Sequence, residues 1–158
     1  MHATRAGGPI TVDGRLDEPD WEGAAPARGF TQDEPFEGRP AMEETEVRIL
    51  YDSGNLYIGA RMYDSDTSRI ARQLTRRDTT GRAAEYFEFS LDPNRDRTTG
   101  YRFRATAAGV QGDHYLYDDT SGDSSWNAVW ESATTEDEDG WTAEEAVGPT
   151  GRACRRRR

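Results

Sequence analysis

The chain has 158 residues with 30 acidic and 20 basic side chains, so its formal net charge is −10 and its length suits one domain. Every basic residue is arginine, and five arginines follow residue 147, so residues 1–147 carry 15 arginines and all 30 acids, a net charge of −15. Because residues 1–147 are so acidic, we do not expect them to bind nucleic acid or an anionic membrane electrostatically.

Sequence features also exclude a membrane span and several kinds of metal site. No apolar run approaches the ~18 residues that a spanning helix needs, and Met1–Gly8 lacks the apolar segment of a signal peptide. The single cysteine, Cys154, excludes an internal disulfide, and His2 and His114 are too few for a histidine-rich metal site. We therefore expect a folded monomer without membrane insertion and without a nucleic-acid partner.

The first elements in chain order are a short helix and a hairpin. Asp17–Gly23 is typical of a short helix, with Asp17 as its cap and Pro19 in its first turn. Residues 45–52 and 56–63 alternate in the manner of two strands, and the intervening Asp52-Ser53-Gly54-Asn55 favours a tight turn. On this pattern, one face of the hairpin carries Val47, Ile49, Tyr51, Leu56, Ile58, Ala60 and Met62, and Leu50 lies on the other face.

A second short helix is expected at Ser68–Leu74, and a second hairpin follows it. Tyr86–Leu91 and Gly100–Ala107 alternate in the same way, and the turn between them begins at Asp92. If Leu91 pairs with Tyr101, Glu88 lies opposite Arg104 on the face away from the core.

The remaining strands are expected at Val110–Tyr117, Asn127–Thr135 and Trp141–Val147. Short strands at intervals of ~8–12 residues with turn residues between them are typical of an antiparallel β-sandwich. We therefore predict an all-β, jelly-roll-like sandwich with one or two short helices, and we assign Trp21, Trp130 and Trp141 to its core.

The last strand has an unusual pattern, because Glu145 shares a face with Trp141, Ala143 and Val147. The β pattern weakens there and gives way to an arginine-rich end. We therefore expect one domain over residues 1–147, shortened at its C-terminal end relative to a longer natural domain, and a disordered tail over residues 148–158.

Four motifs resemble family 9 carbohydrate-binding modules in order and spacing over residues 10–144. They are Ile10–Trp21, Asn55–Ile58, Glu85–Asp92 and Gly140–Glu144. More closely, the chain resembles the N-terminal domain of bacterial proteins that join such a module to a predicted outer-membrane β-barrel. The resemblance implies a β-sandwich that binds an oligosaccharide or polysaccharide without cleaving it, as part of a larger secreted or envelope protein that is extracellular, periplasmic or outer-membrane associated.

The resemblance also implies site residues. Family members hold a sugar ring between two tryptophans, with polar contacts from a glutamate that matches Glu88 and an arginine that matches Arg104. The first tryptophan would fall near Arg82, so this chain has no ring there, and the second belongs to a part of the module beyond this chain. The alternative for Glu88 and Arg104 is a surface ion pair worth ~0.2–1 kcal/mol.

Aromatic residues supply further candidates, because the C–H face of a sugar packs on a flat ring. Trp126 follows the polar segment 118–125 and could be presented to a ligand, whereas Tyr115 and Tyr117 are rim residues or structural ones. The candidate carbohydrate-binding residues are Glu88, Arg104, Trp126, Arg82, Tyr115 and Tyr117.

Neither a resident metal nor catalysis is indicated. Residues 92–103 begin like a calcium loop, but Arg97 and Phe103 stand where an EF-hand needs Gly and Glu. The family resemblance leaves structural calcium open, with acidic turns such as Glu136–Asp139 as ligands, although solvated acidic loops explain these turns better. No pair of carboxylates is singled out for glycosidase chemistry. The alternatives to a binding module are a structural or interaction domain without sugar affinity and, more weakly, an accessory fragment of a glycoside hydrolase.

Overall fold

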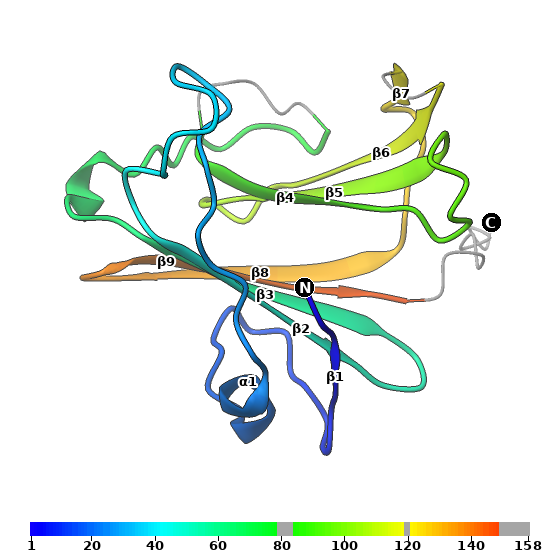
Figure 1. Ribbon diagram of the computed structural model, residues 1–158, viewed down its shortest axis with the longest axis horizontal. Helices are drawn as coiled ribbons and strands as arrows, with labels where there is room; N and C mark the ends of the chain where they lie inside the picture. Colours follow the sequence, from blue (N-terminus) through cyan, green and yellow to red (C-terminus); the bar gives the residue numbers. More distant parts are fainter. Residues whose placement is uncertain (79–83, 119–120, 149–158) are drawn as a thin grey trace.

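The computed structural model describes residues 1–78, 84–118 and 121–148, which fold as two packed β-sheets (Figure 1). The first sheet contains, in spatial order, β1 (Thr4–Arg5), β2 (Thr45–Tyr51), β3 (Leu56–Tyr63), β9 (Gly140–Val147) and β8 (Trp130–Asp137). The second sheet contains β4 (Tyr86–Leu91), β5 (Gly100–Thr106), β6 (Gln111–Tyr117) and β7 (Ser121–Asp123). Neighbouring strands are antiparallel except β1 and β2. The predicted antiparallel β-sandwich is confirmed.

The β2–β3 hairpin forms around the side chain of Asp52. Its Oδ1 accepts hydrogen bonds from the backbone N–H groups of Gly54 (2.6 Å) and Asn55 (2.7 Å), and Tyr57 donates its hydroxyl to Oδ2 (2.9 Å). The two backbone hydrogen bonds, with that from Tyr57, lower the pKa of Asp52 because they stabilise the carboxylate. The turn residues therefore fix the register, in which Val47 lies opposite Ala60.

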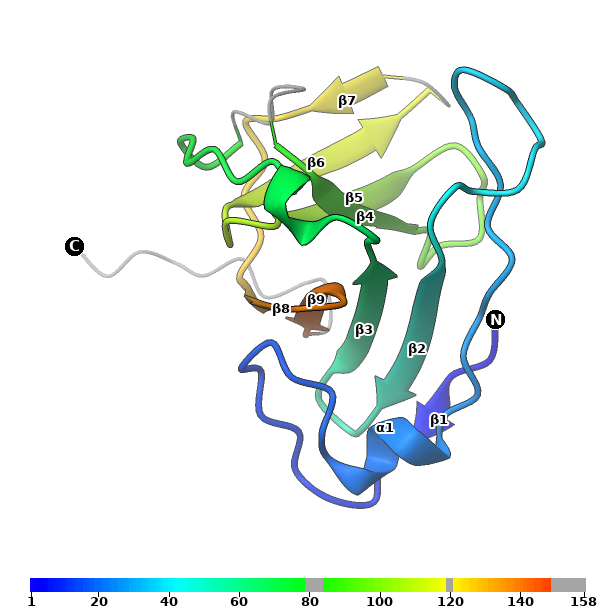
Figure 2. The same cartoon turned by 90° about the vertical axis from the view of Figure 1, so that its left-hand side faces the viewer.

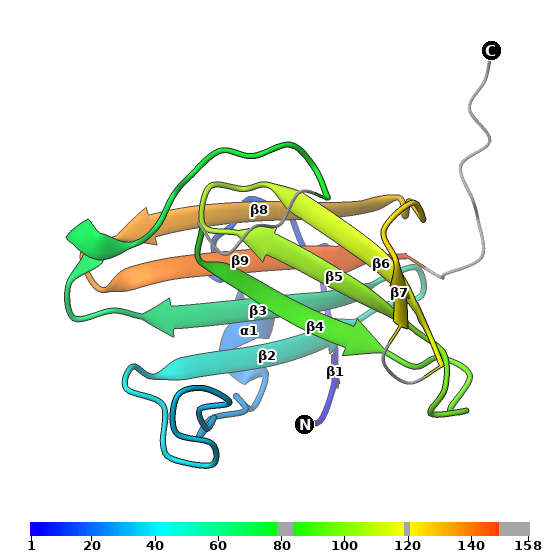
Figure 3. The same cartoon turned by 90° about the horizontal axis from the view of Figure 1, so that it is seen from above.

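The main core lies between the two sheets. Buried residues from both ends of the chain meet there, including Val47 and Ile58 of the first hairpin and Trp141 of β9. From the second sheet, Phe103 stacks on Phe89 (ring centroids 5.3 Å apart) and meets the edge of Trp130 (5.3 Å). The predicted core positions of Trp130 and Trp141 are confirmed. Figure 3 shows β4, β5 and β6 crossing over the strands of the first sheet.

A second core lies on the opposite side of the first sheet, where the N-terminal segment covers it (Figure 2). Trp21 is 1% exposed and packs there with Leu50 and Tyr57. A Cβ atom at Gly59 would lie only 2.6 Å from Leu16 Cδ2 and 3.0 Å from Trp21 Cζ3, so any larger residue here would displace the Leu16 side chain. Trp21 is buried as predicted, but outside the sandwich, and Leu50 is buried on the face of the hairpin opposite to that of Val47.

The two predicted helices are shorter than expected. The first, α1, spans Pro19–Gly23, and Pro19 starts it as predicted; its N-cap is Glu18 rather than Asp17, because the Glu18 carbonyl accepts the Trp21 N–H (2.9 Å). The prediction of a helix over Ser68–Leu74 is wrong. Only a single 3₁₀ turn forms, η1 (Thr67–Arg69), because the chain then extends and buries Ile70 in the main core. No helix of the described segments is long and apolar enough to cross a membrane.

Strand β9 continues to Val147 as predicted, and it carries two fully buried glutamates on opposite faces. Glu144 faces the N-terminal cover, where its Oε2 accepts the N–H groups of Asp13 (2.9 Å) and Gly14 (3.0 Å). Glu145 faces the main core beside Ile58, and neither of its carboxyl oxygens has a hydrogen-bond partner in the described part of the chain. Burial raises the pKa of Glu144 to about 7 and the pKa of Glu145 well above its ordinary value. The arginine-rich segment lies outside the described residues from Pro149 onward.

Candidate functional site

The outer face of the second sheet, which points away from the main core, holds the polar side chains that define the candidate site. Figure 3 looks onto this face. The predicted pairing of Leu91 with Tyr101 is confirmed, and it sets Glu88 opposite Arg104. On β6, His114 lies opposite Arg102. Because side chains alternate along a strand, these residues share the face that Phe89 and Phe103 do not occupy. We define the outer face by the side chains of Tyr86, Glu88, Ser90, Arg102, Arg104, His114 and Leu116.

Glu88 on β4 and Arg104 on β5 form a close ion pair on this face. Arg104 Nε donates a hydrogen bond to Glu88 Oε2 (2.6 Å), and Arg104 Nη2 lies 2.5 Å from the same oxygen. The guanidinium also lies over the ring of Tyr86, 3.8 Å from its centroid. Only 14% of the Arg104 side chain and 22% of the Glu88 side chain are exposed, so the pair is held rigidly. Because both contacts use Oε2, the Oε1 atom keeps free acceptor capacity.

Arg102 brings a second guanidinium to the same carboxylate without bonding it well. Its Nε lies 3.4 Å from Glu88 Oε1, outside hydrogen-bond geometry, and 39% of its side chain is exposed. His114 Nδ1 likewise has no hydrogen-bond partner among the described residues. The face therefore presents donors and acceptors that a polar ligand could satisfy.

The aromatic candidates lie on the other side of the second sheet. Tyr115 pairs with Tyr101 and shares its inward face (centroids 5.6 Å apart), and Tyr117 follows on the same side. Trp126 packs on Tyr101 (4.8 Å) and on the edge of Phe103 (6.2 Å). The structure thus brings Tyr115, Tyr117 and Trp126 together, but not with Glu88 and Arg104. Arg82 lies outside the described residues.

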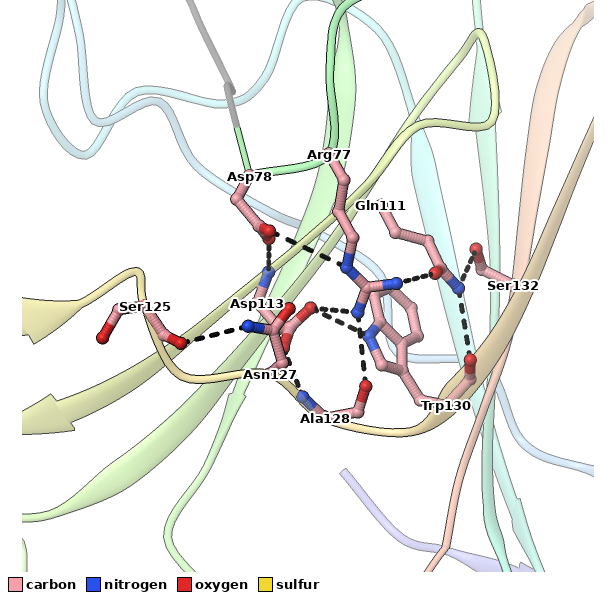
Figure 4. A network of polar contacts seen from close by, with 9 residues as sticks. All are labelled: Arg77, Asp78, Gln111, Asp113, Ser125, Asn127, Ala128, Trp130 and Ser132. Carbon is pink, nitrogen blue, oxygen red and sulfur yellow. Dashed lines mark hydrogen bonds and ion pairs between the residues drawn. The ribbon is translucent and has the colours of Figure 1, made fainter. Parts of the chain in front are cut away.

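A polar network around the buried Asp113 holds the segment that follows Trp126 (Figure 4). Asp113 is completely buried and accepts hydrogen bonds from Arg77 Nη2 (2.5 Å), the Ala128 N–H (2.6 Å) and Trp130 Nε1 (3.3 Å). These bonds hold the chain before β8 against β6, so β8 begins at Trp130 and not at the predicted Asn127. The same region contains β7, which was expected to be a polar loop and instead pairs with the end of β6.

Sequence reasoning missed Tyr86, Arg102 and His114 as members of the outer face. Alternation along β4 and β5, with the same register that placed Glu88, would have identified Tyr86 and Arg102. The burial of Asp113 could not be predicted in this way, because an aspartate in an alternating strand is expected at the surface.

No group of three or more His, Cys, Asp or Glu side chains in residues 1–78, 84–118 and 121–148 is placed to hold a metal ion. The acidic turns use their carboxylates locally. Asp137, for example, accepts hydrogen bonds from Arg61 (2.6 Å) and from the Asp139 N–H (2.9 Å), and the Arg61 bond is the main cause of its lowered pKa.

No protein-family model matches the chain, and no curated protein sequence matches it. Among solved structures, a family 9 carbohydrate-binding module from Caldicellulosiruptor kristjanssonii in complex with cellotriose is similar, with a TM-score of 0.64 and 18% identity over 94% of this chain and 67% of that one. A family 9 module from the same organism in complex with glucose gives a TM-score of 0.65 and 16% identity over 94% and 69%.

A candidate carbohydrate-binding protein from Bacteroides uniformis is also similar, with a TM-score of 0.63 and 11% identity over 92% of this chain and 71% of that one. The chain therefore has the fold of family 9 carbohydrate-binding modules, as the sequence motifs predicted. The link to an outer-membrane barrel stays a prediction.

Proposed function

We propose that the chain is a non-catalytic carbohydrate-binding module that binds an oligosaccharide or polysaccharide on the outer face of its second sheet. The observation that supports this most is the half-buried Glu88–Arg104 pair, which Tyr86 braces on the open face of the sheet. The family resemblance assigns sugar contacts to these two positions. The similar solved structures include modules in complex with cellotriose and glucose.

The chemistry of the pair suits a sugar. Glu88 Oε1 accepts from one hydroxyl while the remaining N–H groups of Arg104 donate to its neighbour, so adjacent hydroxyls of one ring are read together. Tyr86 fixes the plane of the guanidinium, which reduces the entropy lost when a ligand binds.

The same face supports binding rather than hydrolysis. Glu88 is the only carboxylate among the described residues of the outer face, and it is already paired with Arg104. Glycosidases use two carboxyl groups that flank the scissile bond. We propose that any catalytic activity belongs to another part of a larger secreted or envelope protein.

The test is calorimetry and affinity electrophoresis with xylan, cellulose and their oligosaccharides. Glu88→Gln should weaken binding by about tenfold or more, because a charge-assisted hydrogen bond contributes ~1.5–3 kcal/mol. Glu136→Gln is the matched control: its side chain is 23% exposed and ion-paired with Arg72 on the first sheet. This control should bind like the wild type.

Several results would contradict the proposal. A folded wild type with no affinity for any of these saccharides would favour the alternative of a structural or interaction domain. Equal binding by wild type and Glu88→Gln would reject the outer face as the site. Release of reducing sugar from the same polymers would reject the non-catalytic assignment.

A further inference from the structure

A depression of about 200 Å³ opens at the end of the outer face. Its floor is the sheet itself, at Ser90, Leu91, Gly100 and Leu116, and its wall is the β4–β5 loop at Asp92, Arg97, Thr98 and Thr99. Ser90 lies opposite Arg102 across the β4–β5 pair, so the depression continues the face that carries Glu88 and Arg104. Its volume is below the ~300–1,000 Å³ of pockets for drug-sized ligands, which suits a single sugar ring.

The loop that walls this depression is fixed before any ligand arrives. Asp96 accepts hydrogen bonds from the N–H groups of Thr98 (2.9 Å) and Thr99 (2.7 Å) and from the Thr99 hydroxyl (2.6 Å), which lower the pKa of Asp96 to about 2. Asp92 Oδ2 accepts the Arg97 N–H (2.9 Å). These bonds hold Arg95 and Arg97 at φ values of 55° and 58°, a conformation that such residues adopt only when the surroundings enforce it.

Two arginines near the depression, Arg102 and Arg97, make no hydrogen bond to a carboxylate in the described part of the chain, and Arg102 has only a loose ion pair with Glu88 (3.4 Å). Arg104 occupies Glu88 Oε2, and Arg102 makes no hydrogen bond to that glutamate. In the described part of the chain, the guanidinium of Arg97 has no ion pair. The carboxylates of Asp92 and Asp96 are turned to backbone N–H groups of their own loop. Because Arg102 and Arg104 share the single carboxylate of Glu88, a chain with a net charge of −10 keeps a local excess of positive charge on this part of its outer face.

We infer that the depression is a subsite for an acidic sugar, in which Arg102 and Arg97 pair with the carboxylate of a uronic acid unit; this rests on the proposed function of the outer face. A planar guanidinium binds a carboxylate through two parallel hydrogen bonds and discriminates it from a neutral CH₂OH group. The hydroxyls of Ser90 and Thr98 hydrogen-bond the ring hydroxyls. The acidic body repels a dense polyuronate, so the ligand is a neutral chain with isolated uronic acid units.

The test is calorimetry on the full chain with two oligosaccharides of one shape. One is a xylo-oligosaccharide that carries a glucuronic acid substituent, and the other is its carboxyl-reduced counterpart. The wild type should bind the acidic form about tenfold more tightly, which corresponds to about 1.4 kcal/mol. This preference should fall as salt is added.

Arg102→Gln should bring the ratio of the two affinities close to one, and Arg97→Gln should reduce it. Arg72→Gln is the matched control, since it removes the same charge from an arginine that pairs with Glu136 on the first sheet. It should keep the wild-type ratio. Arg102→Lys, which keeps the charge but loses the planar fork, should retain only part of the preference.

The outcomes separate this inference from the proposed function. Equal affinity of the wild type for both forms would overturn the acidic subsite and leave the proposed function in place. Binding of neither form would overturn both. Binding of the acidic form alone supports the subsite, and a preference that survives both Arg102→Gln and Arg97→Gln would overturn its assignment to this depression.

Discussion

The two sheets of the sandwich each have an outer face; one of these faces is buried and the other is exposed to solvent. The outer face of the first sheet is covered by the N-terminal segment, which buries Trp21 against Gly59 and draws two backbone N–H groups onto Glu144. The outer face of the second sheet stays accessible and holds Glu88, Arg102 and Arg104 at partial exposure.

The difference shows how each face is used. On the covered face, burial makes apolar packing strong and makes a carboxylate expensive to ionise, so that face contributes stability. On the open face, charged groups keep contact with water and with one another, so they contribute little to stability and remain able to bind a ligand. The following substitutions test whether the covered face stabilises the fold while the open face is free to bind a ligand.

Trp21→Ala should lower the free energy of unfolding by about 3–5 kcal/mol, because it empties the centre of the covered face. Tyr86→Ala on the open face, where the side chain is 46% exposed, should lower it by less than about 1 kcal/mol. Urea denaturation measures both. Equal losses of unfolding free energy in the two variants would contradict the assignment of stability to the covered face.

Glu144 should make stability depend on pH. Its pKa rises from 4.5 to about 7 on folding, so the folded state holds the proton more tightly than the unfolded chain does. Its contribution is therefore full below about pH 4.5 and is lost as the pH rises to about 7, by about 3 kcal/mol in all.

Glu144→Gln removes this titration and keeps an oxygen to accept the N–H groups of Asp13 and Gly14. The variant should match the wild type near pH 4 and be more stable by about 3 kcal/mol at pH 8, with urea denaturation at each pH as the measurement. A difference that does not change with pH would show that Glu144 is solvated in the folded state.

Glu145→Met should raise the free energy of unfolding by about 2 kcal/mol at pH 8, because it replaces a buried carboxyl without hydrogen-bond partners by an apolar side chain of similar length. Thermal unfolding is the measurement. Glu138→Met, in the exposed β8–β9 turn, is the control and should change stability by less than about 0.5 kcal/mol. A destabilised Glu145→Met variant would mean that the carboxyl is hydrogen-bonded in the folded protein.

Glu88→Gln should change the free energy of unfolding by less than about 1 kcal/mol, since its ion pair with Arg104 is partly solvated. The same variant should lose saccharide affinity, so calorimetry and urea denaturation together separate binding from stability. A large loss of stability would place Glu88 with the structural residues.

Much of the fold and the charged pair of the candidate site could be predicted from the sequence. Alternation and turn residues act over a few positions, so they fixed the two hairpins and the register that pairs Glu88 with Arg104. The same rules place Tyr115 on the face of Tyr101, which separates it from Arg104. Trp126 lies in a segment without periodicity, and only Asp113 and its buried partners decide where that ring packs.

By itself, the sequence determined the class of fold, the longer strands and the charged pair Glu88 and Arg104 of the outer face, because each depends on neighbours along the chain. The tertiary structure alone decided which faces are covered. Alternation of apolar and polar residues distinguishes the two faces of a strand, but contact with residues ~40–130 positions away decides whether each face is exposed to water. For that reason Leu50 and Glu144 are buried, whereas Glu88 and Arg102 remain at the surface.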